Sequence, residues 1–155
     1  VRMNRLRIMN NGRQGMTNAG GSGVVAVDCH FSETGVTGGE YRNHGPSAGV
    51  DVEPFRDLPV KSDFRGLRCR FDGNLGAPVV AGNPHRTGLV ELIDCGGRVP
   101  EMKRMILSPE QATIRGGEWH NVQIACAYAA RRRFTQQINI DVSGATWSGD
   151  DPGWP

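Results

Sequence analysis

Clusters of turn-forming residues divide this chain into short segments, and they constrain its fold more than any other feature of the sequence. They occur at Asn10-Asn11-Gly12, Gly20-Gly21-Ser22-Gly23, Gly38-Gly39, Asp72-Gly73-Asn74, Gly96-Gly97 and Gly116-Gly117. Glycine supplies backbone angles that other residues resist, and such clusters interrupt helices. The 155 residues include 22 glycines, about twice the usual share of roughly 7%. The spacing of the clusters therefore predicts a protein of short elements joined by many turns.

The segments between the turns alternate apolar and polar residues, as strands with one buried face do. The predicted inward residues are Val25, Val27, Cys29 and Phe31; Leu67, Cys69 and Phe71; Val122, Ile124, Cys126 and Tyr128; and Ile138, Ile140 and Val142. Helical spacing is poor throughout, and the one helical candidate, Pro109–Ile114, fits a strand equally well at its end. We therefore expect an all-β protein.

An internal repeat runs through the cysteines. Residues 27–31 and residues 67–71 both read apolar-x-Cys-x-Phe, and Cys95 and Cys126 also follow strand-like runs. Repeats that bury one face against their neighbours are typical of a β-solenoid. A β-sandwich or barrel is the alternative, and composition does not separate the two.

The charged and sulfur-containing residues exclude several kinds of site. The four cysteines form no CxxC pair and the histidines have no zinc-finger spacing, so we expect reduced, buried cysteines and no metal. No dinucleotide or P-loop motif is present, so we expect no cofactor. All basic residues except Lys61 and Lys103 are arginine; this suits an acidic ligand, although codon usage in a GC-rich genome gives the same bias.

Membrane insertion and nucleic-acid binding are not expected. No apolar run approaches the ~18 residues of a membrane helix, and no signal peptide opens the chain. Arg131-Arg132-Arg133 would suit phosphate, but only Phe134 adjoins it for base stacking, so we interpret it as a solvated turn.

Residues 8–55 carry a more specific pattern in three linked elements. These are Asn10-Asn11-Gly12 with Gly15-Met16, Asp28-Cys29-His30-Phe31 with Thr34-Gly35, and residues 46–54, Pro-Ser-Ala-Gly-Val-Asp-Val-Glu-Pro. In this order they resemble a coil segment of right-handed parallel β-helix proteins of the pectate-lyase-like superfamily, above all phage tailspikes and capsule depolymerases. Phe55 departs from that pattern, since such proteins often have Asn there.

The resemblance implies an architecture and a function. It implies an all-β, right-handed parallel β-helix with coils of three short strands, a long groove and a homotrimeric assembly. It also implies a virion protein of the phage tail, assembled in the host cytoplasm, that binds or cleaves bacterial surface polysaccharide. The alternatives are a secreted polysaccharide lyase or uronate epimerase of the same fold, and a non-catalytic segment that trimerises and caps a spike. We expect β-helix coils over 1–148, as the C-terminal part of a longer protein, and an irregular tail over 149–155.

Asp51 and Glu53 are the first candidate catalytic residues. The alternation in Gly-Val-Asp-Val-Glu-Pro directs Val50 and Val52 inward and both carboxylates outward. Two residues along a strand span about 6.6–6.8 Å, and carboxyl groups ~6.5–9.5 Å apart suit an inverting glycosidase. The alternative is a scaffold role, with the acids bound to turn amides or arginines.

The loop before this motif and one tryptophan supply the remaining candidates. His44 is a candidate for proton transfer near neutral pH, and it joins Tyr41 and Asp51 in the lyase or epimerase interpretation. Tyr41 would stack on a sugar and Arg42 would hold a carboxylate; a solvated loop tip is the alternative. Trp119 is a candidate sugar-binding side chain because an indole face packs on a pyranose ring.

Overall fold

The computed structural model describes residues 1–36, 47–54, 60–82, 87–107, 109–125 and 139–150, and in these ranges the chain forms strands and no helix. The strands are β1 (Arg2–Asn4), β2 (Arg7–Met9), β3 (Met16–Asn18), β4 (Val24–Val27), β5 (His30–Ser32), β6 (Val50–Val52), β7 (Ser62–Leu67), β8 (Arg70–Asp72), β9 (Val79–Ala81), β10 (Thr87–Ile93), β11 (Gly97–Leu107), β12 (Gln111–Arg115), β13 (Glu118–Ala125), β14 (Asn139–Ser143) and β15 (Thr146–Ser148). The predicted all-β class is confirmed. The segment proposed as a helix, Pro109–Ile114, contains most of β12 instead.

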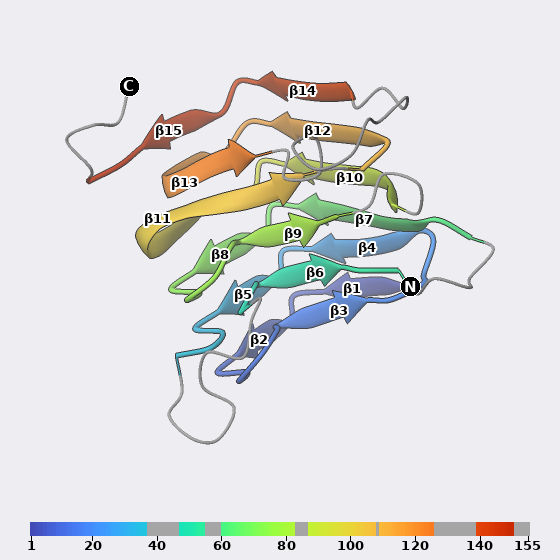
Figure 1. The fold of residues 1–155 in the computed structure, drawn as a ribbon, viewed down its shortest axis with the longest axis horizontal. Coiled ribbons are helices and arrows are strands. Elements are labelled where there is room, and N and C mark those ends of the chain that lie inside the picture. Colours follow the sequence, from blue (N-terminus) through green and yellow to red (C-terminus); the bar gives the residue numbers. More distant parts are fainter. Residues whose placement is uncertain (37–46, 55–59, 83–86, 108, 126–138, 151–155) are drawn as a thin grey trace.

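The strands form three sheets in which every described pair is parallel. The first sheet has the order β1-β4-β7-β10-β12-β14, the second β15-β13-β11-β9-β6-β3, and the third β2-β5-β8. Neighbours in a sheet are never consecutive in the chain, because the chain visits another sheet before it returns (Figure 1). The result is a stack in which each new strand lies beside the strand of the previous visit.

A turn at the end of each strand of the first sheet corrects the strand boundaries expected from the sequence. Asp28, Arg68 and Asp94 have φ angles of 53°, 51° and 51°, so the chain bends between β4 and β5 and between β7 and β8. The expected single strand through Val25 and Phe31 is therefore wrong. In β4 Val24, Ala26 and Val27 are buried and Val25 is half-buried, whereas Cys29 and Phe31 are buried as expected.

These turns lie in register and bond to one another. The amide of Asp28 donates to the carbonyl of Leu67 (2.9 Å), and the amide of Arg68 donates to the carbonyl of Ile93 (2.8 Å). The Arg68 guanidinium also donates to both carboxylate oxygens of Asp28, at 2.7 and 3.0 Å. Repeated backbone hydrogen bonds satisfy polar groups that a turn would otherwise leave open. We call this series of turns, which Arg5 begins and Gly116 and Gly144 continue, the turn column.

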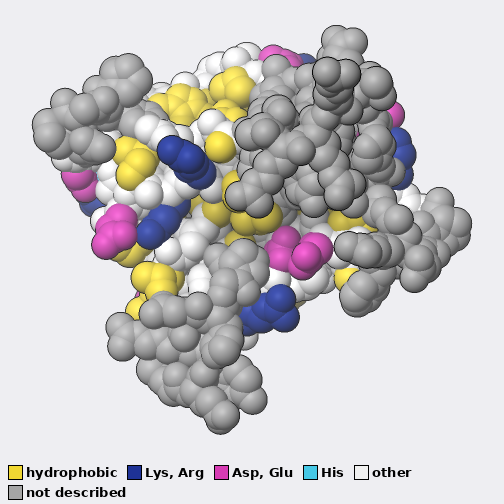
Figure 2. All heavy atoms as spheres, in the orientation of Figure 1, with side chains coloured by type: hydrophobic (Ala, Val, Ile, Leu, Met, Phe, Trp, Pro, Cys, Tyr) yellow, Lys and Arg dark blue, Asp and Glu magenta, His cyan; other side chains and the backbone are white. Residues whose placement is uncertain are grey.

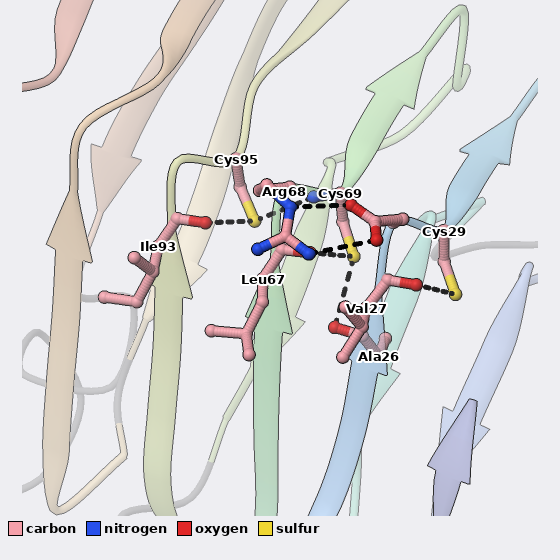
Figure 3. Close-up of polar contacts among 9 residues, drawn as sticks. Ala26, Val27, Cys29, Leu67, Arg68, Cys69, Ile93 and Cys95 are labelled. Atoms are coloured by element: carbon pink, nitrogen blue, oxygen red, sulfur yellow. Dashed lines mark hydrogen bonds and ion pairs between the residues drawn. The ribbon is translucent and has the colours of Figure 1, made fainter. Parts of the chain in front are cut away.

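Beside the turn column, three cysteines lie one above another in the core (Figure 3). Cys29, Cys69 and Cys95 are buried, free thiols, as the sequence predicts for these three; Cys126 lies outside the described residues. The Cys69 thiol contacts the carbonyl of Ala26 at 3.4 Å, and the Cys69 amide donates to the Cys95 sulfur at 3.3 Å. In the next layer Gly117, rather than another cysteine, lies against the backbone of Cys95.

Aromatic rings fill the core beside the third sheet. Phe31 stacks on Phe71 with 5.3 Å between ring centroids, in line with the repeat noted in the sequence. Phe71 stacks on Trp119 at 5.9 Å, and Trp119 stacks on Trp147 at 5.9 Å. Large buried rings of this kind each contribute about 1.5–3 kcal/mol of hydrophobic stabilisation. The rings therefore form one continuous aromatic column.

Candidate functional site

The candidate residues from the sequence separate into three groups in the structure. Tyr41, Arg42 and His44 lie in 37–46, outside the described residues. Trp119 is 1% exposed and belongs to the aromatic column, so its indole offers no open face to a sugar. Asp51 follows Val50 at the middle of β6 and belongs to a described polar cluster.

Asp51 lies on the outer face of the second sheet but is covered. Its neighbours in register are Thr17, which is exposed, and Val80, which is half-buried, whereas Val50 and Val52 are buried in the core. Asp51 itself is only 3% exposed. The expected outward direction therefore holds, but the carboxyl group is shielded from water.

Gln14 supplies part of that cover. Its Nε2 donates a hydrogen bond to Oδ2 of Asp51, and its Oε1 accepts one from the Thr17 hydroxyl at 3.0 Å. The Gln14 amide is thereby oriented from both ends. Glu53, two residues along from Asp51, is exposed.

Burial is the largest cause that raises the pKa of Asp51, the negative charge of Glu53 is the next, and together they bring it to about 6. The hydrogen bond from Gln14 and the positive charge of Arg13 oppose the shift. A carboxyl group that exchanges its proton near neutral pH is what a general acid requires. The cluster thus pairs one protonatable, shielded carboxyl group with one exposed carboxylate.

A second polar site lies where the strands of the second and third sheets meet. It is a surface hollow of about 310 Å³ lined by Arg70, Gly97, Arg98, Glu118, Trp119, His120, Thr146 and Ser148. This size is at the lower end of the ~300–1,000 Å³ of small-molecule sites. The lining comes from β8, β11, β13 and β15, which are adjacent layers of the stack. We call this site the arginine hollow.

His120 contacts three polar side chains in and beside the arginine hollow. Its Nδ1 is 2.9 Å from the hydroxyl of Ser148, and its Nε2 is 3.1 Å from a carboxylate oxygen of Asp150. The same Nε2 lies 3.3 Å from Nη2 of Arg98. The Asn121 amide also binds Asp150, donating from Nδ2 at 3.1 Å. One hydroxyl, one guanidinium and one carboxylate, from Ser148, Arg98 and Asp150, thus meet at this imidazole.

The charges around Asp150 favour its ionised form. Hydrogen bonds from His120 and Asn121, and to a smaller extent the charges of His120 and Arg98, lower the pKa of Asp150. Arg70 is paired with Asp72 at 3.2 Å. Within the described ranges, by contrast, no carboxylate oxygen lies within 4 Å of the Arg98 guanidinium.

Of the residues that line the arginine hollow, only Trp119 was a candidate from the sequence, because the polar ones are far apart in the chain. Arg98 and His120 are 22 residues apart, and Asn121 and Asp150 are 29 apart, with no motif to join them. Only the parallel pairing of β11 with β13 brings Arg98 opposite His120. The spacing between strands would predict this pairing only if the register of the turns were already known.

The rest of the described surface is mixed in charge. The face in Figure 2 shows basic and acidic side chains interspersed with apolar ones. Among the residues that the structure describes, no three metal-ligating side chains form a group, and no helix is long and apolar enough to span a membrane. The basic run Arg131-Arg132-Arg133 lies outside those residues.

Comparisons with protein-family models, with curated proteins and with solved structures found no match for this chain.

Proposed function

We propose that the chain is a segment of a right-handed parallel β-helix that binds bacterial surface polysaccharide, as a trimeric tailspike of a phage virion does. The parallel sheets support this architecture, because each visit of the chain adds one strand beside the last. Crossovers between parallel strands are right-handed in about 98% of cases. The resemblance of residues 8–55 supports the tailspike type.

The observation that carries the binding function is the arginine hollow. It presents a guanidinium, an imidazole, a carboxylate and two hydroxyls on an outer surface, from Arg98, His120, Glu118, Thr146 and Ser148. Sugars are bound through several hydrogen bonds to their hydroxyls, and these groups donate and accept such bonds. A site assembled across strands of a rigid stack holds its groups in fixed positions.

A polysaccharide panel tests the proposal. Purified capsular and O-antigen polysaccharides would be screened by affinity electrophoresis with the wild-type chain, and light scattering would give its oligomeric state. We expect retardation by at least one polysaccharide and a trimer. Glu118→Gln with Ser148→Ala should abolish the retardation, whereas Glu91→Gln, on the first sheet, should not. Absence of binding to every polysaccharide, or equal retardation of both variants, would contradict the proposal.

Hydrolysis at Asp51 is a second candidate function, and the raised pKa of this carboxyl group favours it. Asp51 would donate its proton to the glycosidic oxygen and Glu53 would activate water, which requires the hydrogen bond between the two carboxyl groups in the free protein to open. Reducing-end assays on a bound polysaccharide test this. Asp51→Asn and Glu53→Gln should each lower the rate by about a hundredfold or more with binding retained. Full activity of both variants would restrict the protein to binding.

A further inference from the structure

The arginine hollow already holds a carboxylate that belongs to the chain itself. Asp150 reaches His120 Nε2 at 3.1 Å and Asn121 Nδ2 at 3.1 Å. The backbone amide of Asp150 donates to Asn121 Oδ1 at 2.8 Å, so the aspartate is held by its backbone as well as by its side chain. The contact shows which chemical group this part of the hollow accepts.

The guanidinium beside this contact is incompletely used. Arg98 Nη2 lies 3.3 Å from the imidazole Nε2 that faces Asp150, yet Arg98 has no carboxylate within 4 Å among the described residues. Arginine forms its strongest hydrogen bonds with carboxylates, often through two N–H groups. A carboxylate placed between Arg98 and His120 would accept hydrogen bonds from both.

We infer that Arg98 and His120 form a subsite for the carboxylate of an acidic sugar, which Asp150 occupies in the free protein. The ligand carboxylate displaces the Asp150 side chain and gains the Arg98 contact that Asp150 lacks. The hydroxyls of Thr146 and Ser148 and the carboxylate of Glu118 line the same hollow and bind the sugar hydroxyls. This inference rests on the proposed polysaccharide binding and specifies its ligand as a uronate-bearing polymer.

The exchange explains why an acidic residue lies beside Arg98 and His120. Asp150 is 69% exposed, so its side chain is able to leave the imidazole without opening the core. Its displacement costs the hydrogen bonds to His120 and Asn121, and the ligand replaces the first of these. Removal of the Asp150 charge should therefore strengthen the binding of an acidic ligand.

The test uses the full chain and a small probe, so that it does not depend on the identity of the polymer. Glucuronate and its methyl ester differ only in the carboxylate, and NMR of the His120 ring reports occupation of the subsite. We expect glucuronate to shift the His120 resonances and the ester to leave them unchanged. Asp150→Asn should tighten glucuronate binding severalfold, and Arg98→Gln should weaken it by about tenfold.

Arg65→Gln is the matched control, because Arg65 is an exposed arginine that pairs with Glu91 at 3.5 Å on the first sheet. Its affinity for glucuronate should equal that of the wild type. Equal binding of acid and ester, equal effects of Arg98→Gln and Arg65→Gln, or unmoved His120 resonances in the wild type and Asp150→Asn would each overturn the subsite.

The failure of the subsite and the failure of the proposed function are distinguishable. A neutral polysaccharide that binds the wild type and Arg98→Gln equally would remove the subsite and leave polysaccharide binding intact. A shift of His120 by glucuronate, with no binding of any bacterial polysaccharide, would support the subsite and contradict the proposed function.

Discussion

Asp51→Asn should make the protein more stable at neutral pH, because the buried carboxyl group is costly to ionise. The pKa of Asp51 rises from 3.8 to about 6 in the folded chain, so the folded state binds this proton more tightly than the unfolded state. The contribution of Asp51 to stability is therefore greatest below pH 3.8 and is lost as the pH rises through about 6. A shift of about two pKa units corresponds to about 3 kcal/mol at pH 8.

Asparagine has the shape of the protonated carboxyl group, and its oxygen still accepts the hydrogen bond from Gln14. We therefore expect the difference in unfolding free energy between Asp51→Asn and the wild type to rise from pH 4 to pH 8, toward about 3 kcal/mol. Urea unfolding followed by circular dichroism at several pH values measures it. The difference between the two proteins removes the contributions of groups that titrate alike in both.

Two controls separate the causes of this shift. Glu53→Gln removes the negative charge that helps to raise the pKa of Asp51 but leaves Asp51 buried. Its difference in unfolding free energy from the wild type should therefore rise less between pH 4 and pH 8, with the same sign. Asp28→Asn, measured in a series extended below pH 4, should act in the opposite sense, because the hydrogen bond from Arg68 lowers the pKa of Asp28 below 3.8 and its contribution is lost as the pH falls through that range. A flat difference for Asp51→Asn between pH 4 and pH 8 would refute the reasoning.

The layers of the stack give three further predictions, each checked by urea unfolding. Gly117→Ala should lower the free energy of unfolding by about 3 kcal/mol or more, because a methyl group there would lie 1.6 Å from the Cys95 carbonyl oxygen. Gly144 also has a positive φ but no atom within 3.6 Å of such a methyl group, so Gly144→Ala should cost only about 1 kcal/mol. Equal losses in the two variants would disprove the steric explanation. Phe71→Ala should cost about 3–5 kcal/mol because it opens a cavity in the aromatic column, and a loss below 1 kcal/mol would show that the column collapses onto the gap. Asn74→Ala should cost about 2–4 kcal/mol because it leaves the Phe31 carbonyl of β5 and the Thr34 amide without their hydrogen-bond partner. Unchanged stability would mean that water replaces both bonds.

The sequence predicted the strand class and the stacked repeat but not the corners. Val-Asp-Cys-His-Phe alternates like one strand, yet the turn at Asp28 divides it between two sheets. Aspartate adopts positive φ less readily than glycine, so no local signal marks this corner. The hydrogen bond of the Asp28 amide to Leu67 helps to hold it, and that partner is known only once the layers are stacked.

The candidate site was predicted in part for the same reason. Alternation is sufficient to place Asp51 on the outer face of β6, but its burial depends on Gln14, 37 residues earlier in the chain. The polar contacts of the arginine hollow join different layers, so their partners could not be predicted from the sequence. Trp119 was expected at the surface, and the aromatic column takes it into the core because its neighbours in the stack are also aromatic.

The stack of strands keeps its register over very unequal lengths of chain. Arg68 bonds to Asp28 across 40 residues, whereas Arg98 meets His120 across only 22, and both pairs lie in neighbouring layers. The fold therefore fixes which residues lie beside one another in neighbouring layers, but it does not fix the number of residues between them. Segments inserted between strands are free to change in length and composition while the layers beneath stay aligned. A change in such a segment therefore does not require a change in the core.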